Sequence, residues 1–166
     1  MPIELPVPWL ITVDILAWLV IHLGVAWLGT QLPVTLFNPN ATPYRQRGWE
    51  RRGRLYERLF RIKVWKDMLP DGAALFARGF PKARLNNGDP AYVERFIRET
   101  CRGEAVHWGV MMTAPLFFLW NPPYVGIIMI VYAAIANLPC ILAQRYNRIR
   151  LNRLLSRMCR PRAVRS

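Results

Sequence analysis

The stretch YVGIIMIVYAAIANLPCILA, residues 124–143, contains twenty residues and no charged side chain. Because an α-helix rises about 1.5 Å per residue, a helix of this length can cross a bilayer core of about 30 Å. A second run of twenty residues, WLITVDILAWLVIHLGVAWL at 9–28, has only Asp14 and His22 as ionisable side chains. Both runs therefore predict transmembrane helices. The run at 9–28 also lacks a basic leader, so we expect an uncleaved span.

A third apolar run covers residues 105–120. Only Asn121, Pro122 and Pro123 separate it from the run at 124–143, which predicts a tight turn between two antiparallel helices. We therefore expect an all-α integral membrane protein with three transmembrane helices, at 9–28, 105–120 and 124–143. The length of 166 residues predicts a single membrane domain over 1–166.

The basic residues predict the orientation in the membrane. The net charge is +13, and all 23 Lys and Arg lie within 45–66, 78–102 or 145–165. With three spans these segments share one side, which the positive-inside rule makes cytoplasmic. We expect a bacterial cytoplasmic membrane protein with its N-terminus outside, a cytoplasmic region at 30–104 and a basic cytoplasmic tail at 144–166. The basic side chains then face anionic lipid headgroups, and nucleic acid is not an expected partner.

Two segments have the pattern of basic amphipathic helices. Within residues 49–69, Leu55, Leu59 and Ile62 recur at helical spacing, and arginines occupy the other side. Residues 147–158 repeat this pattern. We expect both segments to lie as interfacial helices on the cytoplasmic side. Asp89 followed by Pro90 is typical of a helix start, and this helix should lead into the second span.

Two carboxylates and an imidazole lie at the cytoplasmic end of the second span. Glu104 and His107 are three residues apart, so they are neighbours on a helix, and Glu99 lies two turns before His107. This arrangement suits a general base whose ring is oriented by a carboxylate.

Other interpretations of these residues stay open. Glu99 and Glu104 could instead pair with Arg95, Arg98 or Arg102. Glu-x-x-His is also the spacing of di-iron helices, although those proteins use two such motifs and this chain has one. Asp14 and His22 share one face of the first span. They could line a cavity for a polar headgroup, or form a structural pair with Asn137 or Tyr132.

More polar side chains are expected at the same interface. Asn137 precedes Pro139 within the third span, and a polar run follows the span. Lys66 and Asp71, at the end of the first amphipathic segment, fall on the same side. These groups could bind a phosphate or a sugar, or the polar run could be a basic stop-transfer cluster. The run contains Gln144, Arg145, Tyr146, Asn147 and Arg148.

Four segments, HLGVAWLGTQLP, VWKDMLPDG, GEAVHW and NLPCILAQRYNRIRL, resemble the glycosyl-4,4'-diaponeurosporenoate acyltransferase family. The resemblance implies transfer of a fatty acyl group to the sugar of a glycosylated carotenoid. It further implies an acyl thioester from the cytoplasm as co-substrate, such as acyl-CoA or an acyl carrier protein, and no other cofactor. The residues that match family segments are Lys66, Asp71, Glu99, Glu104, His107, Asn137, Gln144, Arg145, Tyr146 and Asn147.

The leading hypothesis is a membrane O-acyltransferase without a metal. His107 acts as the base and Glu104 or Glu99 orients it. The expected substrate-binding residues are Lys66, Asp71, Arg98, Arg102, Asn137, Gln144, Arg145, Tyr146 and Asn147. A non-catalytic membrane subunit that binds lipid or positions a pathway enzyme is the alternative. A metal-dependent membrane enzyme is the third possibility.

Overall fold

The computed structural model describes residues 6–69 and 89–159, and Asp71 lies outside these residues. The described part is helical and contains no strand. Its elements are α1 (Val7–Gln31), η1 (Val34–Leu36), η2 (Gly48–Gly53), α2 (Arg54–Phe60), α3 (Ile62–Trp65), η3 (Lys66–Met68), α4 (Pro90–Thr113), η5 (Ala114–Leu119) and α5 (Pro123–Met158).

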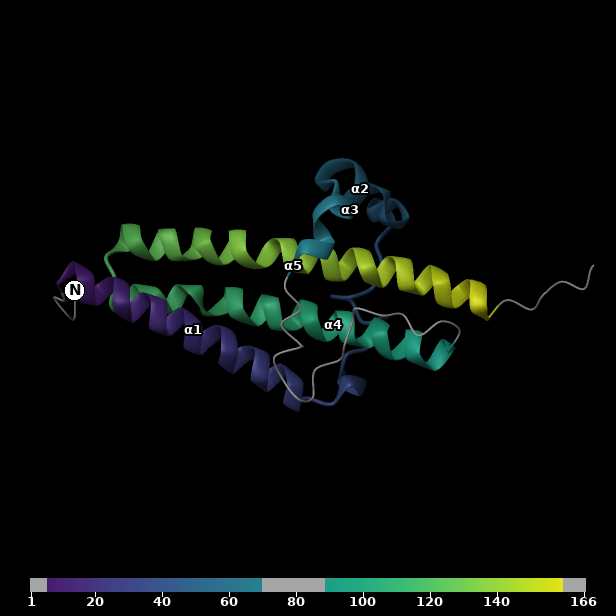
Figure 1. Ribbon diagram of the computed structural model, residues 1–166, viewed down its shortest axis with the longest axis horizontal. Helices are drawn as coiled ribbons and strands as arrows, with labels where there is room; N and C mark the ends of the chain where they lie inside the picture. The colour runs from purple at the N-terminus through teal and green to yellow at the C-terminus, as the bar shows by residue number, and fades with distance from the viewer. Residues whose placement is uncertain (1–5, 70–88, 160–166) are drawn as a thin grey trace, which may run out of the picture.

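Helices α1, α4 and α5 form an elongated bundle, and α2 and α3 stand to one side of it (Figure 1). Small residues let α1 and α4 approach closely. A Cβ atom on Gly29 would lie 2.4 Å from Val106 Cγ2, and one on Gly109 would lie 3.1 Å from Val25 Cγ1. The residue numbers of these pairs rise along one helix and fall along the other, so α1 and α4 are antiparallel.

The predicted turn at 121–123 joins η5 to α5 and lies against α1. Asp14 is buried, and its Oδ1 accepts hydrogen bonds from Trp120 Nε1 and Asn121 Nδ2, both at 2.8 Å. The hairpin is confirmed, because the pairs His107–Asn137 and Glu104–Arg145 run in opposite directions along α4 and α5. Asp14 has the structural role that was one of its two predicted roles. Its partners are Trp120 and Asn121, and not Asn137 or Tyr132 as predicted.

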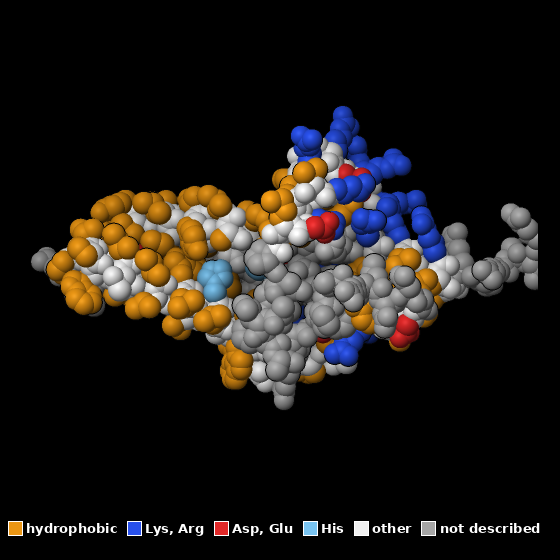
Figure 2. Space-filling view, in the orientation of Figure 1, with side chains coloured by type: hydrophobic (Ala, Val, Ile, Leu, Met, Phe, Trp, Pro, Cys, Tyr) orange, Lys and Arg blue, Asp and Glu red, His pale blue; other side chains and the backbone are white. Residues whose placement is uncertain are grey.

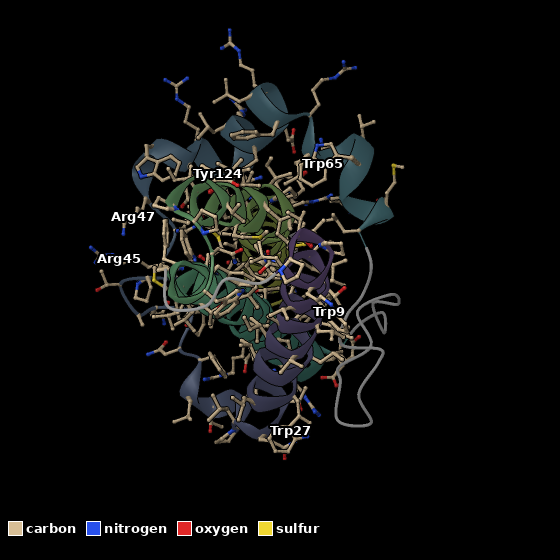
Figure 3. All side chains as sticks on the ribbon, turned by 90° about the vertical axis from the view of Figure 1, so that its left-hand side faces the viewer. Trp9, Trp27, Arg45, Arg47, Trp65 and Tyr124 are labelled. Carbon is tan, nitrogen blue, oxygen red and sulfur yellow. The ribbon has the colours of Figure 1, made fainter. Side chains whose placement is uncertain are left out.

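Apolar side chains cover the outer surface of one half of the bundle (Figure 2). Trp9 and Tyr124 lie at its end, labelled in Figure 3, and Trp27 lies near the other end of α1. Trp27 lies eighteen positions after Trp9, which corresponds to about 27 Å of helix, close to the thickness of a bilayer core. Exposed aromatic residues at this spacing are typical of the two membrane interfaces.

Two helices, α1 and α5, are long and apolar enough to cross a membrane, which fits membrane association. The third predicted span, residues 105–120, is divided between the end of α4 and the 3-10 helix η5. It is not among the two candidate helices, and so a third span stays a prediction.

Residues 147–158 are helical as expected, but they do not form a helix of their own, because α5 continues without interruption for 36 residues to Met158. The buried apolar side chains of this segment pack on α4. Leu151 is buried against Val93, Phe96 and Ile97 of α4. The helix start at Asp89 is confirmed, since its side chain accepts a hydrogen bond from Ala91 N at 2.9 Å.

The segment at 49–69 is helical but not one helix. Arg51, Arg52 and Arg61 have φ values of 47°, 58° and 47°, in the left-handed region, and Gly53 has φ 89°. These residues divide the segment into η2, α2, α3 and η3. We call residues 48–68 the arm. Its buried side chains Tyr56 and Ile62 pack on α5.

Candidate functional site

His107 of α4 and Asn137 of α5 form a polar pair between the two helices. Their Nδ1 and Oδ1 atoms are 2.9 Å apart. Asn137 is 1% exposed, and its Nδ2 donates to Ala133 O at 2.9 Å. Because a carbonyl oxygen only accepts, this second bond fixes which end of the amide faces the imidazole. His107 Nδ1 must then carry the proton, and Nε2 keeps the lone pair that a general base needs.

The His107–Asn137 pair lies where the exposed apolar surface of the bundle ends. On the apolar side of it, Met112 of α4 is 72% exposed and Ile135 of α5 is 70% exposed.

Four charged side chains, Glu50, Glu104, Arg145 and Arg148, form an ion cluster about one turn of α4 from His107. Arg145 Nη1 donates to Glu104 Oε1 at 2.9 Å, and Arg145 Nε donates to Glu50 Oε1 at 3.2 Å. Arg148 Nη2 pairs with Glu104 Oε2. Both glutamates are 1% exposed, and the two positive charges balance the two negative ones. Such a cluster fixes how η2, α4 and α5 sit together.

The same arginines hold the backbone of the chain segment before η2. Arg145 Nη1 donates to Pro43 O and Arg148 Nε to Tyr44 O, both at 3.1 Å. Arg148 also lies over the Tyr44 ring and donates to Cys101 Sγ at 3.6 Å. Burial raises the pKa of the Cys101 thiol and of the Tyr44 hydroxyl, so both stay protonated near neutral pH.

The arm is tied to the ion cluster by Tyr56, which is 1% exposed. Its hydroxyl donates to Glu50 Oε1 at 2.5 Å. Burial, and then the hydrogen bond to Glu50, raise the pKa of Tyr56 well above its usual value. The phenol therefore remains a donor throughout the neutral range.

Tyr56→Phe should lower the free energy of unfolding by about 1.5–3 kcal/mol near neutral pH, because it removes a hydrogen bond to a charged group. A tyrosine with a raised pKa in the folded state stabilises fully below the unfolded-state pKa of about 10, and this stabilisation is lost as the pH rises further. The difference between native chain and variant should therefore shrink above about pH 10. Urea titrations in detergent at several pH values measure it, and a constant difference would contradict this account.

The other predicted site residues on α4 and in the arm are already engaged or lie apart. Glu99 pairs with Arg102 at 2.5 Å, as one of the open interpretations held, and Arg98 is half-buried. Lys66 pairs with Asp67 in the arm.

The predicted site residues that follow Asn137 on α5 have different surroundings. Tyr146 is buried against the arm and donates to Glu57 Oε1 at 2.7 Å. Gln144 Oε1 is buried without a partner among the described residues. Asn147 is half-buried. The structure thus joins His107 to Asn137 and Glu104 to Arg145. Glu104 was expected to orient His107, but its carboxylate faces two arginines, and Asn137 contacts Nδ1 of the ring.

The Glu-x-x-His spacing does not gather metal ligands in the part of the chain that the structure describes. The carboxylate of Glu104 faces two guanidinium groups. Across residues 6–69 and 89–159, no three His, Cys, Asp or Glu side chains come together as candidate ligands. His22 lies on α1 with its ring centroid 5.6 Å from that of Trp18.

Sequence reasoning missed Glu50 and Tyr44. Glu50 lies in a run of arginines, where an acidic residue is usually a solvent-exposed counter-charge. Its possible signal is the spacing of three residues from Arg47, whose backbone N donates to Glu50 Oε2 at 2.5 Å. The partner on α5 is 95 residues away, and no local pattern indicates it.

Comparison with known proteins identifies one family. A family model described as glycosyl-4,4'-diaponeurosporenoate acyltransferase matches residues 40–157. Two curated relatives of that name, from Staphylococcus aureus strains USA300 and Newman, are each 34% identical to this chain over 138 residues. The alignment covers 83% of this chain and 83% of each relative. No solved structure matches. The resemblance seen in the sequence is thereby confirmed.

Proposed function

The chain belongs to the glycosyl-4,4'-diaponeurosporenoate acyltransferase family, and from this premise we propose that it moves a fatty acyl group from a thioester donor to a sugar hydroxyl. The acceptor is a glycosylated carotenoid or a similar glycolipid held in the membrane. The observation that carries the proposal is the His107–Asn137 pair at the edge of the apolar surface, which places the ring proton on Nδ1 and gives Nε2 the lone pair of a base.

In this mechanism His107 Nε2 takes the proton of the sugar hydroxyl as its oxygen attacks the thioester carbonyl carbon. The C–S bond then breaks, and the imidazolium returns the proton to the leaving thiolate. The products are an ester and a free thiol, so no oxidant or metal is consumed. Asn137 holds the ring by its Nδ1–H and stabilises the tautomer that the step requires.

The ion cluster positions the catalytic helices and does not itself react. Glu104 is one turn from His107 on α4, and its two arginines fix α5, which carries Asn137. The donor's anionic carrier is attracted by the surrounding positive charge, to which the half-buried Arg98 of α4 contributes.

The proposed topology has three spans. Asp14 near the start of α1 bonds to the turn before α5, so this turn lies at the apolar end of the bundle, away from the basic residues. If α1 and α5 cross the bilayer, the segment 105–120 crosses with them. The positive-inside rule then puts the basic half in the cytoplasm and the N-terminus outside.

The function is tested with lipid extracts and with purified protein. Mass spectrometry compares membrane lipids of cells with and without the chain, and the purified chain is then incubated in detergent with a glycosylated carotenoid and a fatty acyl-CoA. We expect an added acyl mass on the glycoside in both experiments, with release of one thiol per product.

An acylated product in cells but not with the purified chain, for acyl-CoA and for an acyl carrier protein alike, would favour the alternative of a non-catalytic subunit. No acylated species in either experiment would overturn acyl transfer. Turnover that requires an added metal ion would support the metal-dependent alternative.

A further inference from the structure

The contacts of the arm fix its position along α5. Tyr56 and Ile62 pack with Ala143, Tyr146 and Ile149, and Leu142 borders the same cluster. On α5 the exposed large apolar side chains run from Tyr124 to Leu138, and after these only Leu154 is exposed. The arm therefore begins about one helical turn beyond the end of the exposed apolar surface of α5.

One side of the arm is apolar and has no partner in the described part of the chain. Figure 2 shows hydrophobic side chains on the part of the arm that faces the apolar half of the bundle. Such side chains on an exposed segment of a protein mark an interaction surface. The exposed large apolar side chains of the arm are Trp49 at 56% exposure, Leu59 at 64%, Phe60 at 44%, Val64 at 69% and Met68 at 81%.

The other side of the arm is strongly basic. Figure 2 shows its Lys and Arg side chains pointing away from the apolar half, and in Figure 3 Arg45 and Arg47 just before it point away from the bundle. Among residues 6–69 and 89–159, no carboxylate forms an ion pair with the five arginines of the arm. These are Arg51, Arg52, Arg54, Arg58 and Arg61.

Three of these arginines have left-handed backbone conformations, namely Arg51, Arg52 and Arg61. Each costs about 1–2 kcal/mol relative to a right-handed conformation. Strain of this kind persists where the fold requires a particular geometry, and it is frequent at binding sites. Here it produces a short folded arm that presents the apolar and basic sides at one level, where a straight helix would extend away from α5.

We propose that the arm is an interfacial anchor for an anionic phospholipid leaflet. Its apolar side enters the outer part of the acyl region, and its arginines bind the phosphate groups beside it. Each such cation contributes about 1 kcal/mol of attraction to an anionic surface. A bilayer is the occupant that fits both sides, because the arm lies just beyond the level at which the apolar surface of α5 ends. The anchor is independent of the proposed acyl transfer.

Because Tyr56 and Glu50 join the arm to the ion cluster, anchoring also holds the cluster at the membrane surface. The lipid bilayer then serves as the third support of the arm, together with α5 and the segment at Pro43 and Tyr44.

The test uses the full chain with Cys140→Ser and Cys159→Ser, which leaves the buried Cys101. Val64→Cys is then labelled with an environment-sensitive fluorophore, and the protein is placed in nanodiscs of phosphatidylcholine alone or mixed with phosphatidylglycerol. The label at 64 should be quenched by a nitroxide on the acyl chain and protected from iodide when phosphatidylglycerol is present. Glu94→Cys on the exposed face of α4 is the matched control and should stay open to iodide in both discs.

Combined Arg51→Glu, Arg52→Glu and Arg58→Glu substitutions should release the label at 64 into water. Since these changes could disturb folding, high salt supplies a second measurement on the unchanged arm, and it should weaken the protection that phosphatidylglycerol gives. Equal exposure to iodide in both discs would overturn the proposal. Protection that appears only when acyl-CoA or an acidic carrier protein is added would also overturn it and would assign the arm to the donor.

Discussion

His107→Ala should lower kcat for acyl transfer by about 100- to 10,000-fold, the usual contribution of a general base. The KM for the thioester should change little, because the ring acts on the acceptor hydroxyl and is not required to bind the donor. The protein should remain folded, since the side chain is only half-buried. Initial rates with purified protein measure the effect, and circular dichroism checks the fold. Full activity in this variant would exclude the proposed base.

Asn137 provides the matched test of how His107 is positioned. Asn137→Ala should lower kcat without a comparable rise in KM, because the ring loses its partner at Nδ1. Asn137→Asp keeps an acceptor opposite that nitrogen and should recover part of kcat. A merely structural role would predict equal losses in both variants, together with loss of stability.

Glu104→Ala should lower the free energy of unfolding by about 3–5 kcal/mol, because it leaves two arginines buried or nearly buried without their common partner. This is a large fraction of the stability of a protein of this size. Urea titration in detergent micelles measures the loss. Glu94→Ala, which removes an exposed carboxylate from the same helix, is the control and should change stability by less than about 0.5 kcal/mol.

A double-mutant cycle with Arg148→Ala separates the pair from its surroundings. The sum of the two single losses in unfolding free energy should exceed the loss in the double variant, because the second substitution removes the charge that the first left unpaired. Strictly additive losses would show that Glu104 and Arg148 do not interact, which would contradict the ion cluster.

The sequence predicts the helices and the turn of this fold well, because they depend on local patterns. Long apolar runs give α1 and α5, and Asp89 with Pro90 gives the start of α4. The Asn-Pro-Pro segment gives the hairpin. These features require only the length of a run or the chemistry of a few neighbouring residues.

The contacts that build the site depend on residues far apart in the chain, so the sequence does not reveal them. Glu104 was predicted beside His107, which its spacing on α4 supports. Its two arginines are 41 and 44 residues away, on α5. Likewise, arginine is a good helix former, so nothing in the segment 49–69 predicts left-handed turns at Arg51, Arg52 and Arg61. Periodicity gave the apolar face of 147–158 but not its partner, which is α4.

The ion cluster also sets an order for biosynthesis. Glu50 leaves the ribosome long before Arg145 and Arg148, since 95 residues separate Glu50 from Arg145. A nascent chain that ends before α5 holds two glutamates without the charges that neutralise them in the folded protein. Chains are made from the N-terminus, so the last helix completes the fold of segments made much earlier. Premature termination within α5 should thus yield a product that cellular quality control recognises as unfinished and degrades.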